Sequence, residues 1–271
     1  MVVSNEVEML ENFEHEGWAD FYAAASPELK RELGILHGVR NDIECFAVRA
    51  RPKSILWNHT MGAGHTAPLT ELALSRVIGF FERNEVSGAI CMTPQAATDE
   101  AKSLLRHRRF MPGYAYRKFA RSAYSAIASV ETDLAVRICQ LKEAQQFGDL
   151  VAEGFETPTR FGTWISQLVG RPQWHCFMAF DGEIPAATGA LYVSNSIGWL
   201  TFGATDPDHR RRGAQSALLA ARIFEARKLG CHTLVMETGE APDGVPEASY
   251  RNILRAGFER SYLRDNWIRT S

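Results

Sequence analysis

The chain has 271 residues, of which 45% are hydrophobic and 23% are charged, so its composition excludes the disordered and fibrous classes. This length allows one large domain or two of ordinary size. The formal net charge of -2 lacks the basic excess that a nucleic-acid-binding domain normally carries, so no nucleic-acid partner is expected.

Targeting signals and disulfides are not expected either. Residues 1–13 are acidic and lack a basic segment followed by an apolar run, the pattern of a secretory signal. No stretch reaches the roughly 18 consecutive apolar residues of a membrane span. The cysteines are scattered, odd in number and mostly set in apolar runs, which favours buried free thiols in a reducing cytoplasm. They are Cys45, Cys91, Cys139, Cys176 and Cys231.

Hydrophobic spacing and turn residues predict alternating strands and helices along the chain. In the first half the order is strand 45–49, strand 54–57, helix 70–81, strand 88–92, a helix capped by Thr98, the pair Arg109-Phe110, and strand 114–119. In the second half it is strands 134–139, 175–180, 187–193 and 197–205, helix 216–229, strand 233–238, helix 247–256, the pair Gly257-Phe258, and strand 262–268. Such an order predicts an α/β or α+β protein with a mixed sheet.

The last elements of the two halves follow the same order, from a helix through a strand and a second helix to a residue pair and a final strand. This weak similarity favours two copies of one fold, although any α/β protein can show such an order by chance. Small and polar residues interrupt the pattern near residues 122–132. We therefore expect domains at 1–127 and 128–271.

A basic loop follows the strand at 197–205 and leads directly into the helix at 216–229. On that helix we expect Leu219, Ile223, Ala226 and Leu229 on the buried face and Arg222, Glu225 and Lys228 on the polar face. A helix start offers unpaired N–H groups and a partial positive charge, and Gly213 permits a tight turn. The loop is therefore a candidate anion site. It reads Asp206-Pro207-Asp208-His209-Arg210-Arg211-Arg212-Gly213-Ala214-Gln215-Ser216.

This loop resembles the acetyl-CoA-binding motif of the GCN5-related N-acetyltransferases (GNAT), whose core is Gln/Arg-x-x-Gly-x-Gly/Ala. Arg210 and Gly213 match the core, whereas Gln215 stands where glycine or alanine is usual, so its side chain must point away from the diphosphate or contact it. The resemblance covers roughly residues 131–271. It implies the acyl-CoA N-acyltransferase fold, a mixed sheet splayed at its centre and flanked by helices. The tandem order implies a degenerate, non-catalytic copy in the first half, where residues 62–64 stand before a helix as the loop does.

The resemblance also implies acetyl-CoA as the acyl donor. Its pantetheine arm would pair with the backbone of Phe202, Gly203, Ala204 and Thr205. Its diphosphate would contact Arg210, Arg211, Arg212, Gly213, Ala214, Gln215 and Ser216. For the arginines, the alternatives are a solvated surface turn and a nucleic-acid contact.

The catalytic groups are less well marked. Glu237 ends the strand expected beside the acetyl group and is a candidate general base, or a carboxylate that only binds loop amides. Many family members place a tyrosine four residues before the Gly-Phe pair as a general acid, but Ile253 stands there. Tyr250, one turn earlier, can substitute or simply pack in the core. Asn252 is a candidate coenzyme contact.

We therefore expect an acetyl-CoA-dependent N-acetyltransferase acting on a primary amine of a small molecule or peptide by direct transfer, without a metal. A non-catalytic acyl-CoA sensor or interaction module is the alternative, and a longer acyl donor is a weaker one. The oligomeric state, monomer or homodimer, stays open. Candidate acceptor contacts are the acidic Glu240 and Asp243 and the aromatic Trp164, Tyr192 and Trp199.

Overall fold

The computed structural model describes residues 4–65, 67–240 and 248–269. The chain forms two compact units, one of residues 1–118 with 261–271 and one of residues 119–260. The expected boundary between residues 127 and 128 therefore lies inside the second unit. Among the described helices, none combines the length and the apolar character that crossing a membrane requires.

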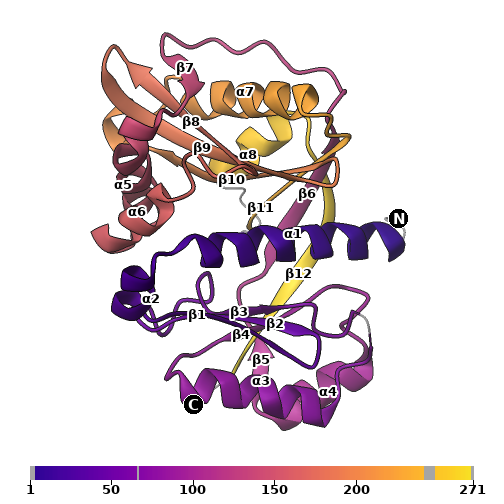
Figure 1. Cartoon of the computed structure of the whole chain (residues 1–271). Coiled ribbons are helices and arrows are strands. Elements are labelled where there is room, and N and C mark those ends of the chain that lie inside the picture. The colour runs from indigo at the N-terminus through magenta and orange to yellow at the C-terminus, as the bar shows by residue number, and fades with distance from the viewer. Residues whose placement is uncertain (1–3, 66, 241–247, 270–271) are drawn as a thin grey trace. The chain divides into compact units, whose positions relative to one another are not determined.

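In the first unit, helices cover both faces of a mixed sheet (Figure 1). The elements are α1 (Ser4–Ala24), α2 (Pro27–Leu33), β1 (Ile35–Arg40), β2 (Ile43–Val48), β3 (His59–Met61), α3 (Glu71–Arg83), β4 (Ala89–Met92), α4 (Asp99–His107), β5 (Phe110–Pro112), the start of β6 (Tyr116–Ser122) and most of β12 (Glu259–Arg269). The strand order is β1-β2-β3-β4-β12, with β5 also paired to β12. Only β3 and β4 run parallel among the pairs with a defined register in this unit.

The predicted helix at 70–81 is confirmed as α3. The Thr70 hydroxyl accepts a hydrogen bond from the Ala73 amide and so caps the helix. Leu74, Val77 and Phe81 are buried at helical spacing against the sheet. Thr98 caps α4 in the same way, as its position predicts.

The predicted strand at 54–57 is wrong, because this segment forms turns before β3. The reason is the buried side chain of Asn58. Its amide donates to the carbonyls of Arg51 (2.7 Å) and Ser54 (2.9 Å), while its Oδ1 accepts from the Val48 amide (2.7 Å). These bonds close the segment into a turn.

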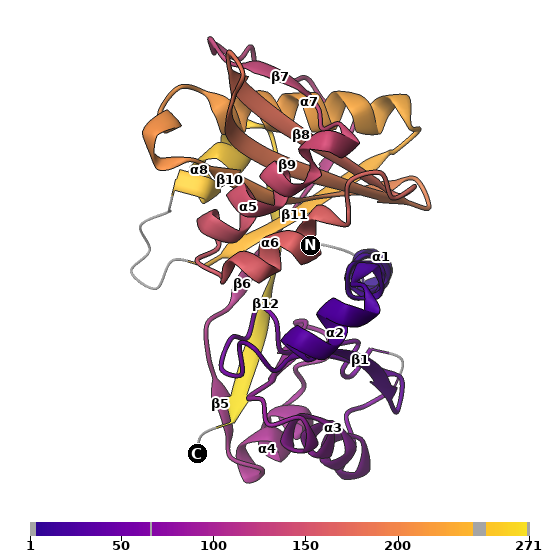
Figure 2. The ribbon, with the colours of Figure 1, turned by 60° about the vertical axis from the view of Figure 1, so that its left-hand side comes forward.

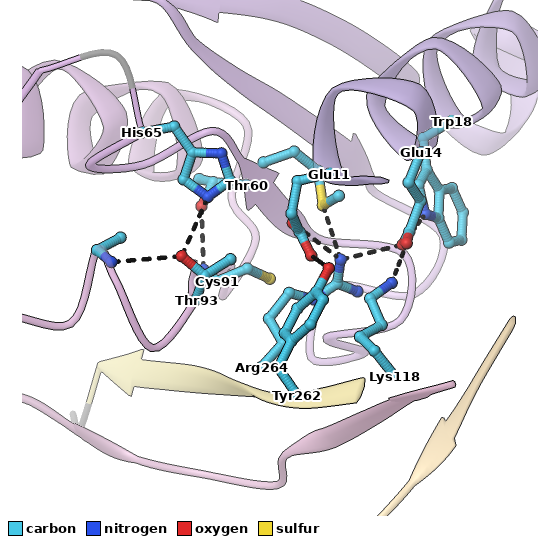
Figure 3. Close-up of polar contacts among 12 residues, drawn as sticks. Glu11, Glu14, Trp18, Thr60, His65, Cys91, Thr93, Lys118, Tyr262 and Arg264 are labelled. Atoms are coloured by element: carbon cyan, nitrogen blue, oxygen red, sulfur yellow. Dashed lines mark hydrogen bonds and ion pairs between the residues drawn. The ribbon is translucent and has the colours of Figure 1, made fainter. Parts of the chain in front are cut away.

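Helix α1, which the sequence pattern did not predict, is fixed by buried charges (Figure 3). Glu14 accepts a hydrogen bond from Arg264 Nη1 at 3.0 Å and forms an ion pair with Lys118. Glu11 accepts a hydrogen bond from the Tyr262 hydroxyl. Burial raises the pKa of Glu11, but the charges of Arg264 and Lys118 outweigh it and bring the pKa to about 2. Since Tyr262 and Arg264 lie on β12, the cluster joins the two ends of the chain within this unit.

In the second unit, helices again lie on both faces of the sheet, with α5 and α6 on one face and α7 on the other (Figure 2). The elements are the end of β6, β7 (Ala135–Ile138), η1 (Leu141–Glu143), α5 (Ala144–Gly154), α6 (Thr159–Ser166), β8 (Trp174–Asp181), β9 (Ile184–Ser194), β10 (Ile197–Thr205), η2 (Pro207–His209), α7 (Ala214–Lys228), β11 (Thr233–Gly239) and α8 (Ala248–Arg255). The strand order is β11-β10-β9-β8-β7. Strands β10 and β11 are parallel, and the others in this run are antiparallel.

The predicted similarity in element order is present, because α3, β4, α4 and β6 occur in the same order as α7, β11, α8 and β12, apart from the short β5 between α4 and β6. Arg109 and Gly257, at corresponding places after α4 and α8, both have a left-handed backbone, with φ of 62° and 78°. Each final strand crosses into the other unit. Trp267 of β12 is buried in the first core, where β12 pairs with β4, and Phe119 of β6 is buried in the second. This exchange of last strands is why a single cut in the chain does not separate the units.

The five cysteines are buried free thiols, as predicted. Burial raises the pKa of several of them, including Cys45 to about 12.

Candidate functional site

Strands β10 and β11 pair at only three positions, which end at Trp199 opposite Val235. Over the described residues beyond these, β10 runs on to Thr205 and β11 to Gly239 without pairing with each other. Two parallel strands that separate in this way leave main-chain groups of both available to a ligand. The splayed centre predicted for the sheet is therefore present in this unit.

A β-bulge lies in the splayed part of β10. Thr201 pairs with Ala190 and Ala204 pairs with Thr188, so β10 has one residue more than β9 between these pairs. Phe202, within the bulge, has a φ of 51°, which is rare for a bulky residue. Its ring is buried, whereas Gly203 is exposed.

Helix α7 begins directly after the loop and has an open N-terminus. Gly213 is its N-cap with a φ of 78°, no side chain caps the helix, and its first turn holds no acidic residue. The structure gives a second reason for this glycine, besides the tight turn. A Cβ on Gly213 would lie 2.3 Å from the carbonyl oxygen of Glu131, so the close approach that requires glycine is to the protein's own backbone.

The three loop arginines differ in their surroundings. Arg212 donates to Asp133 and Asp181, each at 2.5 Å, and its carbonyl accepts from the Thr132 hydroxyl. These hydrogen bonds raise the pKa of Arg212 and lower the pKa values of both aspartates. Arg210 and Arg211 are exposed, and within the described part of the chain neither side chain has an ion pair. Arg212 therefore secures the loop, and Arg210 and Arg211 are the arginines available to a ligand.

Asp206 shapes the start of the loop, a role that sequence reasoning missed. Its Oδ1 accepts a hydrogen bond from the Asp208 amide at 2.9 Å and lies 2.9 Å from His209 Nδ1. The hydrogen bond with His209 lowers the pKa of Asp206. The signal was present, because aspartate before proline at the start of a short helix is a typical N-cap.

A comparison with protein-family models gives a match over residues 138–244 to the model described as "Acetyltransferase (GNAT) family". Residues 138–244 form a GNAT domain. The resemblance drawn from the basic loop is thus confirmed, and the matched segment contains β8 to β11, the loop and α7. We call residues 119–260 the GNAT unit.

The fold is similar to that of solved structures over most of the chain. A GCN5-related N-acetyltransferase from Kribbella flavida has a TM-score of 0.63 at 14% identity, covering 88% of this chain and 90% of its own. One from Sphaerobacter thermophilus has a TM-score of 0.61 at 14% identity, covering 84% and 76%. A tandem GNAT protein from the clavulanic acid biosynthesis pathway has a TM-score of 0.56 at 10% identity, covering 83% and 76%. These likenesses confirm the predicted fold, and no curated protein matches the chain by sequence.

Gln215, the departure from the family motif, is turned toward β10. Its Nε2 lies within hydrogen-bond distance of the carbonyls of Ala204 (2.8 Å) and Thr188 (3.2 Å) and of Thr205 Oγ1 (3.0 Å). Ala214 beside it is buried and Ser216 is half-buried. The side chain of Gln215 thus binds the GNAT unit's own strands.

Glu237 lies on β11 two residues beyond the last pair with β10, and it is half-buried. Its neighbours Met236 and Thr238 face α8, since Met236 packs against the core that contains Tyr250 and Thr238 Oγ1 lies 3.2 Å from Ser249 Oγ. Because side chains alternate along a strand, Glu237 points to the opposite face of β11.

Tyr250 lies in the core of the GNAT unit and is 4% exposed. Its ring centroid lies 4.9 Å from that of Phe119. Its hydroxyl accepts a hydrogen bond from Arg260 Nε at 2.6 Å, which raises the pKa of Arg260. Ile253, at the family's usual tyrosine position, is also buried. Asn252 is half-buried, and its Oδ1 accepts from Arg255 at 3.5 Å.

The aromatic residues suggested as acceptor contacts do not line an open surface. Trp164, Tyr192 and Trp199 are all buried, and Tyr192 and Trp199 pack on Trp174 with ring centroids 5.0 and 6.1 Å apart. They form core because both faces of this sheet are covered by helices. Asp243 lies outside the described residues.

Proposed function

We propose that the GNAT unit transfers the acetyl group of acetyl-CoA to a primary amine of a small molecule or peptide, by direct transfer in a ternary complex. One observation carries the proposal. The parallel strands β10 and β11 separate beyond Trp199 and Val235, next to a helix N-terminus that no side chain caps.

The residues present fit the coenzyme. The amides of residues 212–216, at the start of α7, would hold the diphosphate together with Arg210 and Arg211. Residues 202–205 of β10 would pair with the pantetheine arm. Carbonyls of Phe202 and Ala204 already accept one hydrogen bond each from side chains, but a carbonyl oxygen has a second lone pair.

The acceptor amine must lose a proton before it attacks. A lysine-like amine has a pKa near 10.4, so only about one in a thousand is neutral at pH 7. Glu237, half-buried on the splayed part of β11, would accept this proton directly or through a water molecule. The face of β11 opposite α8 is then the side from which the amine approaches.

The departing thiolate needs a proton or another stabilising group. Tyr250 accepts a hydrogen bond from Arg260, so its own O–H proton is left for donation. It lies on the α8 side of β11 and Glu237 on the other, so acid and base would act from opposite faces of one strand. Direct transfer also depends on proximity and on main-chain polarisation of the thioester carbonyl.

The second candidate is a non-catalytic acyl-CoA-binding module of the same fold. It is favoured by the burial of Tyr250 in the core and by Ile253 at the position where many family members have their acid. In this case the coenzyme site would be retained and no acetyl group would be transferred.

One assay separates the two candidates, namely release of free CoA thiol from acetyl-CoA over a panel of primary amines. For the enzyme we expect amine-dependent release that falls at least about 100-fold in Glu237→Gln, the loss expected for a general base. Tyr250→Phe should give a smaller loss, and Glu153→Gln, at an exposed site on α5, should behave as the unsubstituted protein. Calorimetric binding of acetyl-CoA without release over the whole panel would support the binding module.

A further inference from the structure

Arg222 of α7 is buried, 2% exposed, although the helical pattern places it on the polar face. Its Nε donates to the Leu218 carbonyl at 3.0 Å, and its Nη1 donates to the carbonyls of Ala190 (3.2 Å) and Thr201 (3.1 Å). No carboxylate pairs with it in the described part of the chain. Burial lowers its pKa. A buried cation without a counter-ion is costly, and here the main-chain carbonyls of α7, β9 and β10 are what offset this cost.

The sheet makes room for this guanidinium at Gly189. A Cβ at that position would lie 2.5 Å from Arg222 Cζ. The head group of Arg222 thus lies directly against β9, where a larger residue would displace it.

Gln215 lies seven residues earlier on α7, close to two helical turns, and therefore on the same face as Arg222. Its amide reaches the carbonyls of Thr188 and Ala204. Both residues thus extend from one helix to the main chain of β9 and β10.

The carbonyls that accept these hydrogen bonds belong to the β9–β10 pairs on either side of the bulge. Thr201 and Ala190 are the last pair before the extra residue, and Arg222 binds the carbonyls of both. On the other side of the bulge, Ala204 and Thr188 are the next pair, and Gln215 binds the carbonyls of both. The Thr188 hydroxyl also donates to the Phe202 carbonyl inside the bulge, at 3.1 Å.

We infer that Gln215 and Arg222 are positioning residues that brace the bulge of β10 from α7. The consequence for the ligand rests on the proposed function, because residues 202–205 are the segment that would pair with pantetheine. This segment lies beyond the positions where β10 pairs with β11, and it contains Phe202 at a positive φ. Holding it in one direction before the ligand arrives reduces the ordering cost of binding.

The brace links the two parts of the coenzyme site. The N-terminus of α7 would hold the diphosphate, and the same helix fixes the strand that would hold the pantetheine arm. The distance between the two subsites is thereby built into α7 and its contacts with β10. The departure of Gln215 from glycine or alanine then has a structural reason.

The test compares two ligands by calorimetry: acetyl-CoA, and ADP 3′-phosphate, the nucleotide half of coenzyme A, which has the diphosphate but no pantetheine arm. We expect Gln215→Ala and Arg222→Met each to weaken acetyl-CoA binding by about tenfold, as loss of preorganised hydrogen bonds implies. Binding of the nucleotide should change by less than about twofold. Arg222→Lys should restore part of the loss, and Lys228→Ala, at the exposed end of α7, should change neither affinity.

The outcomes are distinguishable. Equal losses for both ligands, or unchanged affinity in both variants, would overturn the brace. Arg222→Met removes a buried group, and if it fails to fold, Gln215→Ala, at a half-buried site, decides alone. Unfolding of both variants would show that these residues serve stability only and would also overturn the inference. If the unsubstituted protein binds no acetyl-CoA, the proposed function fails, and the inference fails with it.

Discussion

The two units contain the same local arrangement, two parallel strands joined by a loop and a helix, β3-α3-β4 in the first and β10-α7-β11 in the second. In the first unit the helix is α3, whose N-terminus is capped by Thr70 and carries Glu71 in its first turn. In the GNAT unit it is α7, which begins at Gly213 with no side-chain cap and no acidic first turn. A side-chain cap occupies a main-chain amide and a carboxylate in the first turn repels an anion, whereas an uncapped start leaves its amides for one. If the proposed function holds, these few residues at the helix start would separate a structural copy from a ligand-binding one.

The two units also differ in the strand that each takes from another part of the chain. The first receives β12 from the far end of the chain, and Glu11 and Glu14 of α1 bind Tyr262 and Arg264 of that strand. The GNAT unit receives the end of β6, with Phe119 in its core. Neither sequence repeat is therefore self-sufficient.

The largest expected effect comes from cutting the chain. A fragment of residues 128–271 loses Phe119 and keeps β12 without its partner β4, so we expect it not to fold cooperatively. A fragment of residues 119–260 keeps the complete GNAT unit, and we expect it to unfold cooperatively and to bind acetyl-CoA. Circular dichroism during urea denaturation compares the two fragments directly. Cooperative unfolding of 128–271 equal to that of 119–260 would show that the end of β6 is dispensable.

The next effect is at the helix start. Gly213→Ala places a Cβ against the carbonyl of Glu131 at a residue with positive φ. A left-handed residue with a Cβ costs about 1–2 kcal/mol, and the overpacking adds to it, so we expect a loss near 3 kcal/mol of unfolding free energy. Chemical denaturation measures this loss. Gly230→Ala is a matched control, because Gly230 also has a positive φ but open space around it, and it should cost less.

The features that the sequence predicted are those with local signals. The caps Thr70 and Thr98, the apolar spacing of α3 and the basic loop before α7 are all readable within a few residues. The resemblance to the GNAT family depended on such a local motif, with Arg210 and Gly213 in place.

The features that were missed depend on side-chain contacts that hydrophobic spacing does not report. The turn at 54–57 is closed by Asn58 through residues 4 to 10 positions earlier. Arg212 pairs with carboxylates 79 and 31 residues away, at Asp133 and Asp181. The position of Arg222 was assigned from its polarity, although the main-chain carbonyls of two strands provide acceptors for it. The exchange of final strands leaves no mark in the periodicity of either strand.

A smaller effect depends on pH and concerns the first unit. Burial lowers the pKa of His15 to about 4, with Glu11 and Glu44 raising it and His65 and Arg264 lowering it. An unfolded histidine has a pKa near 6.5, so the unfolded chain binds more protons between pH 6.5 and 4, and stability falls as the pH falls through this range. From pH 7 to pH 5 we expect His15 to account for a loss of about 2 kcal/mol.

Urea denaturation at pH 7, 6 and 5 measures this loss, and His15→Gln should make the dependence shallower. Burial also lowers the pKa of His65, so part of the slope should remain in this variant. Glu11, with a pKa of about 2 in the folded protein, contributes little to this change, because even its ordinary pKa of 4.5 lies below the range. A slope unchanged by His15→Gln would show that other groups cause the acid sensitivity.

The smallest expected effect tests the comparison of the helix starts most directly. Thr70→Ala removes the hydroxyl that caps α3 and should cost about 1 kcal/mol of unfolding free energy. Acetyl-CoA affinity should not change, because α3 is not the helix that would bind the diphosphate. Arg210→Ala should show the reverse, with stability unchanged and acetyl-CoA affinity reduced several-fold, more strongly at low salt because the side chain is exposed. If Thr70→Ala instead weakened binding in calorimetry, the first unit would take part in coenzyme recognition, and its capped helix would not mark it as the structural copy.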